Sequence, residues 1–308
     1  GKGSGAKDHW TGRFGYLGGI QVTGMLLRLF KVVLLAMTAL LPVSAFAETG
    51  HPQPGEIDLQ GSVTPIMDSI RSFHDGMLIW IISAITLLVL VLLIIVIFRF
   101  NAKANPIPYT TSHNTSNEIA WTVLPILVLV TIAVPSFGVL ADQMTVPDGQ
   151  RHYLGSQIFS RGTGVVLPAP GLTVKVIGNQ WHWSYEYPDN GDVTYDSYML
   201  SEDERAAQKP DQPRLLAVDE ELVVPVDTTV RVQVTASDVI HSFAVPSFGV
   251  KVDAVPGRLN ETWFYVRKTG IYYGQCSELC GKDHAFMPIA VRVVSKEDFA
   301  KWVKTLQD

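Results

Sequence analysis

The sequence predicts a two-helix transmembrane hairpin followed by an all-β sandwich domain. Two long apolar stretches without charged residues lie in the first half of the 308-residue chain. Charged residues make up only 17% of the chain, which favours a membrane protein. After residue 140 the sequence changes to short β-branched runs separated by Gly, Pro, Asp and Asn, a pattern typical of a sandwich or barrel.

The N-terminal region carries a signal for export. Residues 25–47 start with a basic stretch, continue through an apolar run and end in Ala45-Phe46-Ala47. This is the pattern of a secretory signal peptide cleaved after Ala47, and a retained transmembrane helix is the alternative. Residues 1–24 form an N-terminal extension without an assigned role. Residues 48–76 are expected to form a periplasmic N-terminal segment.

Two stretches, residues 77–98 and 119–140, are predicted to span the membrane. Each exceeds the ~20 apolar residues that a bilayer requires. A buried core helix is the alternative, and two such stretches disfavour it. The loop at 99–118 carries Arg99 and Lys103 close to the first span, so the positive-inside rule places this loop in the cytoplasm.

Residues 141–308 are therefore expected to form a periplasmic domain. Its β-branched runs predict strands at 172–177, 222–226, 229–235, 262–266 and 289–294. Ser295, followed by acidic residues, is expected to cap a short terminal helix.

The run from Cys276 to Met287 carries the clearest chemistry. It holds both cysteines of the chain, Cys276 and Cys280, together with His284 and Met287, and His241 lies upstream. Thiolate, imidazole and thioether are the soft ligands that suit copper. Two cysteines at this spacing allow both thiolates to bridge two metal ions, each of which also needs an imidazole and a weak ligand.

Three alternatives use the same cysteines. A Cys276–Cys280 disulfide suits an exported domain, but the short loop that it closes gains little stability. A zinc site leaves Met287 unexplained. Dithiol redox chemistry usually uses C-x-x-C near a βαβ pattern, and neither is found here.

These residues resemble the CuA loop of subunit 2 of haem-copper cytochrome c oxidases. The similarity covers roughly residues 60–308 and includes the segments 178–187, 241–246 and 253–258. It implies a cupredoxin-like Greek-key sandwich as the exported domain. It also implies a multi-pass protein of the bacterial cytoplasmic (inner) membrane with its C-terminal domain in the periplasm.

The resemblance implies a subunit that accepts electrons from cytochrome c at a dinuclear copper centre, CuA. Electrons would pass to haem in subunit 1, where oxygen is reduced to water with coupled proton translocation. The expected partners are subunit 1, subunit 3, cytochrome c and the lipid bilayer. The chain lacks the His-rich spans that bind haem, so it would not be catalytic alone. No nucleic-acid or phosphate motif is present.

Ligand roles follow from the same resemblance. Both cysteines would bridge the coppers, His241 and Met287 would complete one copper, and His284 and the backbone carbonyl of Glu278 would complete the other. The Glu278 carboxylate would bind a magnesium or manganese ion shared with subunit 1, against the alternative of a free surface acid.

Glu118 is implied to lie at the entrance of a proton channel in subunit 1. An acid near a helix N-terminus is also favoured by the helix dipole alone.

Residues 141–308 are acidic, with 16 Lys and Arg against 22 Asp and Glu. Acids around an aromatic patch attract a basic partner. The resemblance makes Trp181 the residue through which electrons enter, and core packing is the alternative for Trp181 and Trp183, which would share a face if both lay on one strand. The predicted docking rim for cytochrome c consists of Glu186, Asp189, Asp192, Asp196 and Asp238.

Two features depart from many relatives. His182 stands where a tyrosine is usual, which suggests pH-sensitive docking or electron transfer. Residues 151–171 resemble an insertion without an assigned role. The rival functions are a quinol-oxidase subunit, which would lack the copper ligands, and a tethered copper chaperone, which would have one span and a thioredoxin-like pattern.

Overall fold

The computed structural model describes residues 50–107, 110, 112–150 and 166–307. The predicted N-terminal extension, the predicted signal peptide and most of the predicted insertion lie outside these residues.

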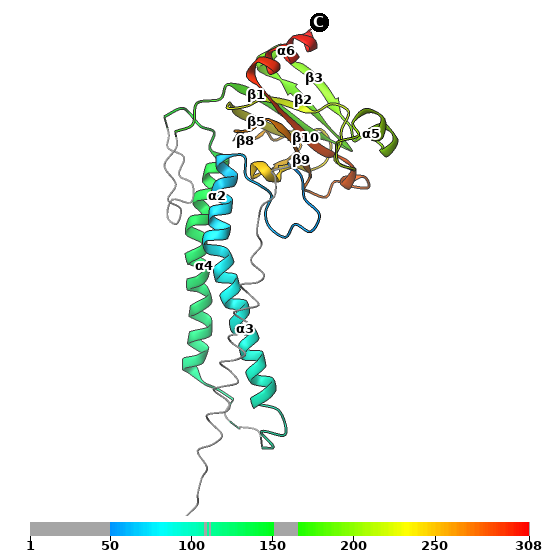
Figure 1. Cartoon of the computed structure of the whole chain (residues 1–308). Helices are drawn as coiled ribbons and strands as arrows, with labels where there is room; N and C mark the ends of the chain where they lie inside the picture. Colours follow the sequence, from blue (N-terminus) through cyan, green and yellow to red (C-terminus); the bar gives the residue numbers. More distant parts are fainter. Residues whose placement is uncertain (1–49, 108–109, 111, 151–165, 308) are drawn as a thin grey trace, which may run out of the picture. The chain divides into compact units, whose positions relative to one another are not determined.

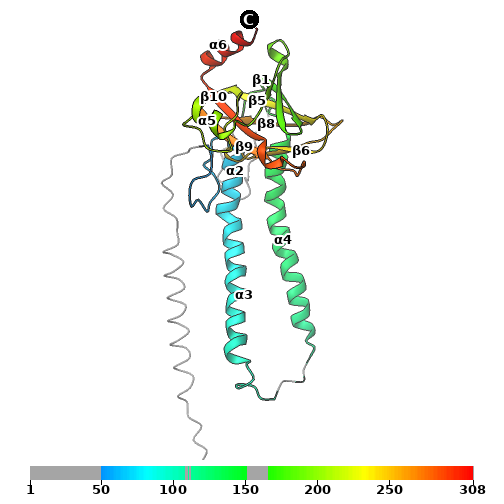
Figure 2. The same cartoon turned by 90° about the vertical axis from the view of Figure 1, so that its right-hand side faces the viewer.

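Two long helices form the predicted hairpin (Figures 1 and 2). Both are long and apolar enough to cross a membrane, and most of their apolar side chains are exposed. The first is a continuous 35-residue helix and the second has 30 residues, so both extend beyond the predicted spans. Their segments are α2 (Pro65–Phe73), a π-helical turn (His74–Leu78), α3 (Ile79–Arg99) and α4 (Thr115–Met144).

The first helix starts at a strong N-terminal signal. The Thr64 hydroxyl accepts a hydrogen bond from the Met67 backbone N–H at 3.1 Å, and Pro65 occupies the first helical turn. Both features stabilise a helix N-terminus. The helix therefore begins twelve residues before the predicted span at Met77, inside the predicted periplasmic N-terminal segment 48–76.

In the described part of the chain, ten strands form two five-stranded sheets. The strand orders are β3-β2-β1-β5-β8 and β4-β10-β9-β6-β7. The strands are β1 (Leu172–Asn179), β2 (His182–Tyr187), β3 (Val193–Ser197), β4 (Leu222–Pro225), β5 (Thr229–Ala236), β6 (His241–Val245), β7 (Val250–Ala254), β8 (Asn260–Tyr265), β9 (Gly270–Cys276) and β10 (Pro288–Val294). The helices of the domain are α5 (Glu202–Gln208) and α6 (Lys296–Gln307).

The core of the sandwich lies between the sheets. Burial alternates along β1, as a strand with one face on a core requires. Val174 and Val176 of β1 lie level with Val232 and Val234 of the parallel strand β5, and all four are fully buried. The predicted hairpin followed by an all-β sandwich is confirmed.

The end of α4 is bound to the sandwich by side chains of β8. Trp263 Nε1 donates to the Asp142 carbonyl at 2.8 Å, and Thr262 Oγ1 donates to the Gln143 carbonyl at 3.1 Å. These carbonyls belong to the last turn of the helix, where intrahelical donors run out. Thr64 adds a second connection, since its hydroxyl donates to the Phe248 carbonyl at 2.7 Å.

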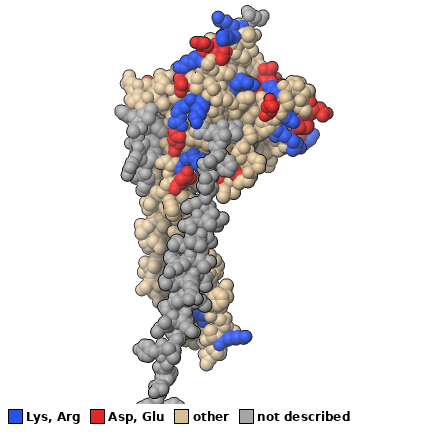
Figure 3. Space-filling model, in the orientation of Figure 1, with Lys and Arg blue, Asp and Glu red and all other residues tan. Residues whose placement is uncertain are grey.

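The charged side chains are distributed differently over the helical hairpin and the sandwich. Figure 3 shows basic side chains at the loop end of the hairpin, uncharged surface along the visible part of the helices, and mixed acidic and basic side chains over the sandwich. Arg99 ends α3 and Lys103 lies in the loop that follows it, and these are the two basic residues on which the positive-inside argument rests.

All five predicted strand runs and the terminal helix are present. The remaining strands were not foreseen, nor was α5, although Ser201 and Glu204 form a capping box that marks its start. The premise that Trp181 and Trp183 share a strand face is wrong, because Trp181 lies in the turn before β2. Trp183 is fully buried and Trp181 is half-buried.

Candidate metal centre

The strand order brings the five predicted side-chain ligands together at one end of the second sheet. Cys276 ends β9, and Met287 immediately precedes β10, the strand that pairs with β9. Cys280 and His284 lie in the loop between them. His241 starts β6, which pairs with the end of β9 through Phe243 and Cys276.

Their donor atoms lie close to one another. The two Sγ atoms are 3.8 Å apart. His241 Nδ1 is 3.9 Å from Cys276 Sγ, and His284 Nδ1 is 3.5 Å from Cys280 Sγ. Met287 Sδ is 3.6 Å from Cys280 Sγ, and the Glu278 carbonyl oxygen is 3.3 Å from Cys276 Sγ. These five separations therefore link six donor atoms into one continuous cluster.

This spacing fits metal coordination. Two ligand atoms about 2.0–2.3 Å from one tetrahedral ion stand about 3.3–3.8 Å apart. The set of two thiolates, two imidazoles, a thioether and a carbonyl suits copper better than a hard ion. His241, Cys276, Cys280 and Met287 are all buried, so the site excludes bulk water.

The cysteines are not joined to each other. Their 3.8 Å separation is well beyond the ~2.05 Å of a disulfide, and both thiols are free and buried. The structure therefore provides two separate sulfur ligands.

The thiols differ in acidity. Burial raises the pKa of Cys276, but hydrogen bonds with His241, with the backbone of Glu278 and Ser242, and with His284 together outweigh burial and bring the pKa to about 6. Burial and the negative charge on Cys276 raise the pKa of Cys280 to about 12. Cys276 is thus readily a thiolate, whereas Cys280 needs a cation to displace its proton.

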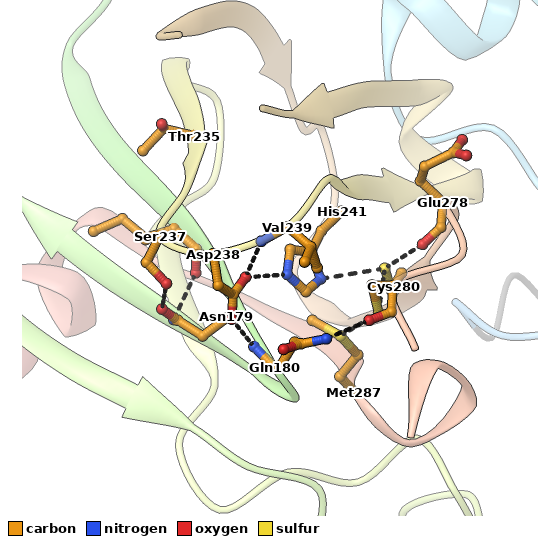
Figure 4. Close-up of polar contacts among 12 residues, drawn as sticks. Asn179, Gln180, Thr235, Ser237, Asp238, Val239, His241, Glu278, Cys280 and Met287 are labelled. Carbon is orange, nitrogen blue, oxygen red and sulfur yellow. Dashed lines mark hydrogen bonds and ion pairs between the residues drawn. The ribbon is translucent and has the colours of Figure 1, made fainter. Parts of the chain in front are cut away.

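Asp238 holds the far side of the His241 ring. Its Oδ1 accepts from His241 Nε2 at 2.9 Å and from the Val239 N–H at 2.6 Å, and its Oδ2 accepts from the Gln180 N–H at 2.7 Å (Figure 4). Burial raises the pKa of Asp238, but these hydrogen bonds outweigh it and keep the pKa below its ordinary value. A proton on Nε2 leaves Nδ1 free to face the thiols, as a ligating histidine requires.

The turn between β1 and β2 also contacts the cysteine loop. Gln180 Nε2 donates to the Cys280 carbonyl at 2.8 Å. A Cβ on Gly281 would lie 3.0 Å from Trp181 Cζ2 and 3.1 Å from Gln180 Nε2. The indole of Trp181 therefore lies directly against the backbone that follows Cys280.

Four of the five predicted docking acids have structural partners. Glu186 forms an ion pair with Lys175 at 2.8 Å, and Asp189 accepts from the Thr173 N–H at 2.6 Å. Asp196 accepts from the Ser184 hydroxyl at 2.6 Å, and Asp238 binds His241 as described. Asp192 is exposed at the turn between β2 and β3.

His182 lies among polar and aromatic neighbours beside the site. Its ring stacks on Tyr198 with centroids 4.4 Å apart, and Nε2 is 3.7 Å from Asp196 Oδ1. Its side chain is only 18% exposed, so a substitution here changes packing as well as charge.

Of the two remaining predicted acids, Glu118 lies apart from the donor atoms and Glu278 lies at their edge. Glu118 accepts from the Asn114 N–H at 3.3 Å and lies 2.7 Å from His113 Nδ1, at the start of α4. These contacts fit the alternative interpretation, in which Glu118 stabilises the N-terminus of α4 through the helix dipole. The Glu278 carbonyl faces Cys276, and its side chain extends away from the sulfur atoms (Figure 4).

Two contributors to the site were missed from the sequence. Gln180 contacts the cysteine loop, and Gly178 makes room for His241, since a Cβ there would be 2.9 Å from three atoms of that side chain. Glycine inside a strand often marks such a close approach, so Gly178 had a readable signal. Gln180 had none.

Two protein-family models match this chain. Residues 172–294 match the family described as cytochrome C oxidase subunit II, periplasmic domain. Residues 52–139 match the family described as cytochrome C oxidase subunit II, transmembrane domain. Together the two matches cover both halves of the described structure.

Individual proteins of known family are similar in sequence to this chain over most of their own length. A probable cytochrome c oxidase subunit 2 of Rickettsia bellii is 48% identical over 89% of this chain and 93% of its own. The cytochrome c oxidase subunit 2 of Cereibacter sphaeroides is 42% identical over 88% of this chain and 87% of its own. The crystal structure of the periplasmic domain of subunit II of cytochrome oxidase of Bradyrhizobium japonicum is 61% identical, covers 46% of this chain and 96% of that one, and has a TM-score of 0.42.

Proposed function

This chain belongs to the cytochrome c oxidase subunit 2 family, whose members are parts of haem-copper terminal oxidases, and on that premise we propose that its sandwich domain accepts electrons from cytochrome c at a dinuclear copper centre. The electrons pass to haem in subunit 1, where oxygen is reduced to water with coupled proton translocation. The observation that carries this proposal is the convergence of six soft or neutral donor atoms at separations of 3.3–3.9 Å.

In the proposed centre the thiolates of Cys276 and Cys280 would hold both coppers. His241 and Met287 would also hold one copper, and His284 with the Glu278 carbonyl would hold the other. When bound, the copper pair supplies a site that gains and loses one electron with little rearrangement. The protein contributes buried ligand side chains, a fixed tautomer at His241 and a second thiol that loses its proton when its sulfur binds the metal.

Trp181 is the proposed point at which electrons enter. Its half-buried indole lies against the backbone after Cys280, which places it between solvent and the ligand loop. Asp192, Asp196, Asp189, Glu186 and Asp238 are proposed as the acidic rim that attracts basic cytochrome c.

Subunit 1 and subunit 3 are the proposed membrane partners, in the bacterial inner membrane with the sandwich in the periplasm. The two apolar helices support membrane insertion. Two finer roles at subunit 1 also remain proposals: the Glu278 carboxylate as a ligand of a shared magnesium or manganese ion, and Glu118 as the entrance of a proton channel.

The test uses the assembled oxidase, purified with the unsubstituted chain and with Cys276→Ser and Cys280→Ser. We expect each serine variant to contain about two coppers fewer per complex and to lose an electron paramagnetic resonance signal in which one electron is shared by two copper nuclei. Ser277→Ala, between the two cysteines, is the matched control and should keep both.

Retention of the signal in the serine variants would overturn the proposal. So would an unsubstituted complex that holds an oxidised Cys276–Cys280 pair and no such copper. The second result would favour the alternative in which Cys276 and Cys280 form a structural disulfide.

A further inference from the structure

We propose that Gln180 and Asp238 are positioning residues that hold Trp181 at a fixed place relative to the copper ligands, an inference that rests on the function proposed above. They act as a clamp: each joins the turn that carries Trp181 to a different ligand-bearing segment. Neither residue is a ligand in this scheme, and neither has to bind cytochrome c for the clamp to work.

The first arm of the clamp reaches His241. The backbone N–H of Gln180 donates to Asp238 Oδ2 at 2.7 Å, while Oδ1 of the same carboxylate binds His241 Nε2 at 2.9 Å. One carboxylate therefore joins the residue before Trp181 to the ring of a proposed ligand (Figure 4).

The second arm reaches the cysteine loop. The side-chain amide of Gln180 donates to the carbonyl of Cys280 at 2.8 Å. Because Cys280 supplies a proposed thiolate ligand, this bond fixes the turn against the cysteine loop. The two arms use different atoms of Gln180, so its backbone and its side chain are both held.

The indole of Trp181 depends on these arms. Among the described residues, Trp181 Nε1 is buried without a hydrogen-bond partner. The ring is therefore held by packing against Gly281 and by the backbone to which it is attached. A turn released from either arm would let the ring move, since no polar contact of the indole resists that motion.

Neighbouring contacts stiffen the base of the same turn. The Ser237 hydroxyl donates to Asn179 Oδ1 at 2.5 Å, and the Ser237 N–H donates to the Gly178 carbonyl at 3.1 Å. Asn179 also donates to the Ser184 hydroxyl at 3.0 Å. The segment before His241 and the turn before Trp181 are thus joined at two successive residues.

The clamp differs from a docking role in what it controls. A docking acid acts through its charge on the affinity for cytochrome c, which appears in KM. A positioning residue acts on the step after binding and on the ligands themselves, which appears in kcat and in the copper spectrum. Outer contacts of this kind typically change activity or metal affinity by roughly 10- to 100-fold when removed.

Gln180→Met tests the second arm in the assembled oxidase. Methionine keeps the length of the side chain and removes the amide donor. We expect kcat for oxidation of cytochrome c to fall by roughly 10-fold or more with little change in KM, and the copper signal to persist. An increase in KM with kcat unchanged would show a docking residue only, and unchanged kinetics would show that the bond to Cys280 has no role; either overturns the clamp.

Asp238→Glu tests the first arm. Glutamate keeps the charge that docking needs but displaces the carboxylate by one methylene. We expect altered copper hyperfine structure in the resonance spectrum in the absence of any cytochrome c. Asp203→Asn removes a charge from the exposed face of α5 and should leave that spectrum unchanged.

The two proposals fail in different ways. If the unsubstituted oxidase shows no dinuclear copper signal, the proposed function fails and the clamp fails with it. If that signal is present and either Gln180→Met matches the unsubstituted oxidase in kcat or Asp238→Glu matches it in spectrum, the clamp alone is wrong.

Discussion

At the scale of single residues, glycines set how closely the proposed ligands approach the first sheet. Gly178 of β1 faces the His241 side chain, and a Cβ there would lie 2.9 Å from its Cβ, Cγ and Cδ2. Real side chains do not tolerate such contacts, so an added methyl must displace the imidazole or the strand.

We therefore expect Gly178→Ala to weaken the proposed copper centre. The imidazole would shift relative to Cys276, and the overpacking should lower stability by about 1–3 kcal/mol. Copper content and the resonance spectrum of the assembled oxidase measure the effect. Gly76→Ala adds the same methyl where no atom lies within 4 Å and should leave both unchanged. A normal spectrum for Gly178→Ala would show that the ring accommodates the methyl without moving.

The sequence predicted the ligands better than their surroundings. Cys276, Cys280, His284 and Met287 are close in sequence, so spacing alone indicates a shared site. The contacts of Asp238 with Gln180, and of Gln180 with Cys280, join residues 58 and 100 positions apart. Such contacts depend on how strands pair, which composition and spacing do not specify.

At the scale of elements, a charged cluster joins the end strand of the second sheet to the segment that contains α5. Glu221 is 5% exposed beside β4 and forms ion pairs with Arg292 of β10 and with Lys209, the latter at 3.0 Å. Gln212 also donates to Glu221 at 2.7 Å. Burial raises the pKa of Glu221, but these hydrogen bonds outweigh it and lower the pKa from its ordinary value of 4.5.

This lowered pKa predicts a pH-dependent contribution to stability. A carboxyl group with a lower pKa in the folded state stabilises fully above its unfolded pKa, and the contribution is lost as pH falls through the folded pKa. Glu221→Gln should lower stability by about 1–3 kcal/mol at pH 7, and the difference should shrink as the pH falls below about 4.5. Thermal unfolding of the purified chain across pH 3–7 measures it.

Glu220→Gln changes the exposed neighbour and is the control, with an expected effect under about 0.5 kcal/mol. A Glu221→Gln difference that stayed constant over the same pH range would contradict the ion-pair explanation.

Element prediction succeeded where strands are rich in β-branched residues, as in β1, β5 and β10. It missed β2, β6 and β9, whose sequences His182–Tyr187, His241–Val245 and Gly270–Cys276 mix aromatic, polar and small residues. Their strand conformation comes from pairing with neighbours, which overrides local preference. It also missed α2, whose Thr64-Pro65 start was a readable signal.

At the scale of the whole molecule, the described hairpin and sandwich belong to one unit, and the end of α4 is held by β8. Helix carbonyls in the last turn need partners from outside the helix. Trp263 supplies one of them from a fully buried indole, so the connection is protected from water.

We expect Trp263→Phe to loosen this junction. The phenyl ring keeps most of the packing but removes the donor to the Asp142 carbonyl, at a cost of about 1–3 kcal/mol. Hydrogen–deuterium exchange of residues 142–146 in the purified chain should become faster. Trp302→Phe in α6 is the control and should leave exchange at 142–146 unchanged. Equal exchange rates in Trp263→Phe and the unsubstituted chain would show that other contacts hold the junction.

The position of the ligand loop also separates the proposed metal site from the pairing of the strands on either side of it. Cys280, His284 and Met287 lie between β9 and β10, strands that pair from Gln275 with Pro288 to Gly270 with Val293 without involving the loop. The backbone pairing of β9 with β10 therefore does not depend on these three side chains. If the proposed copper binds there, the loop that carries Cys280 and His284 can adjust while the two strands keep their register.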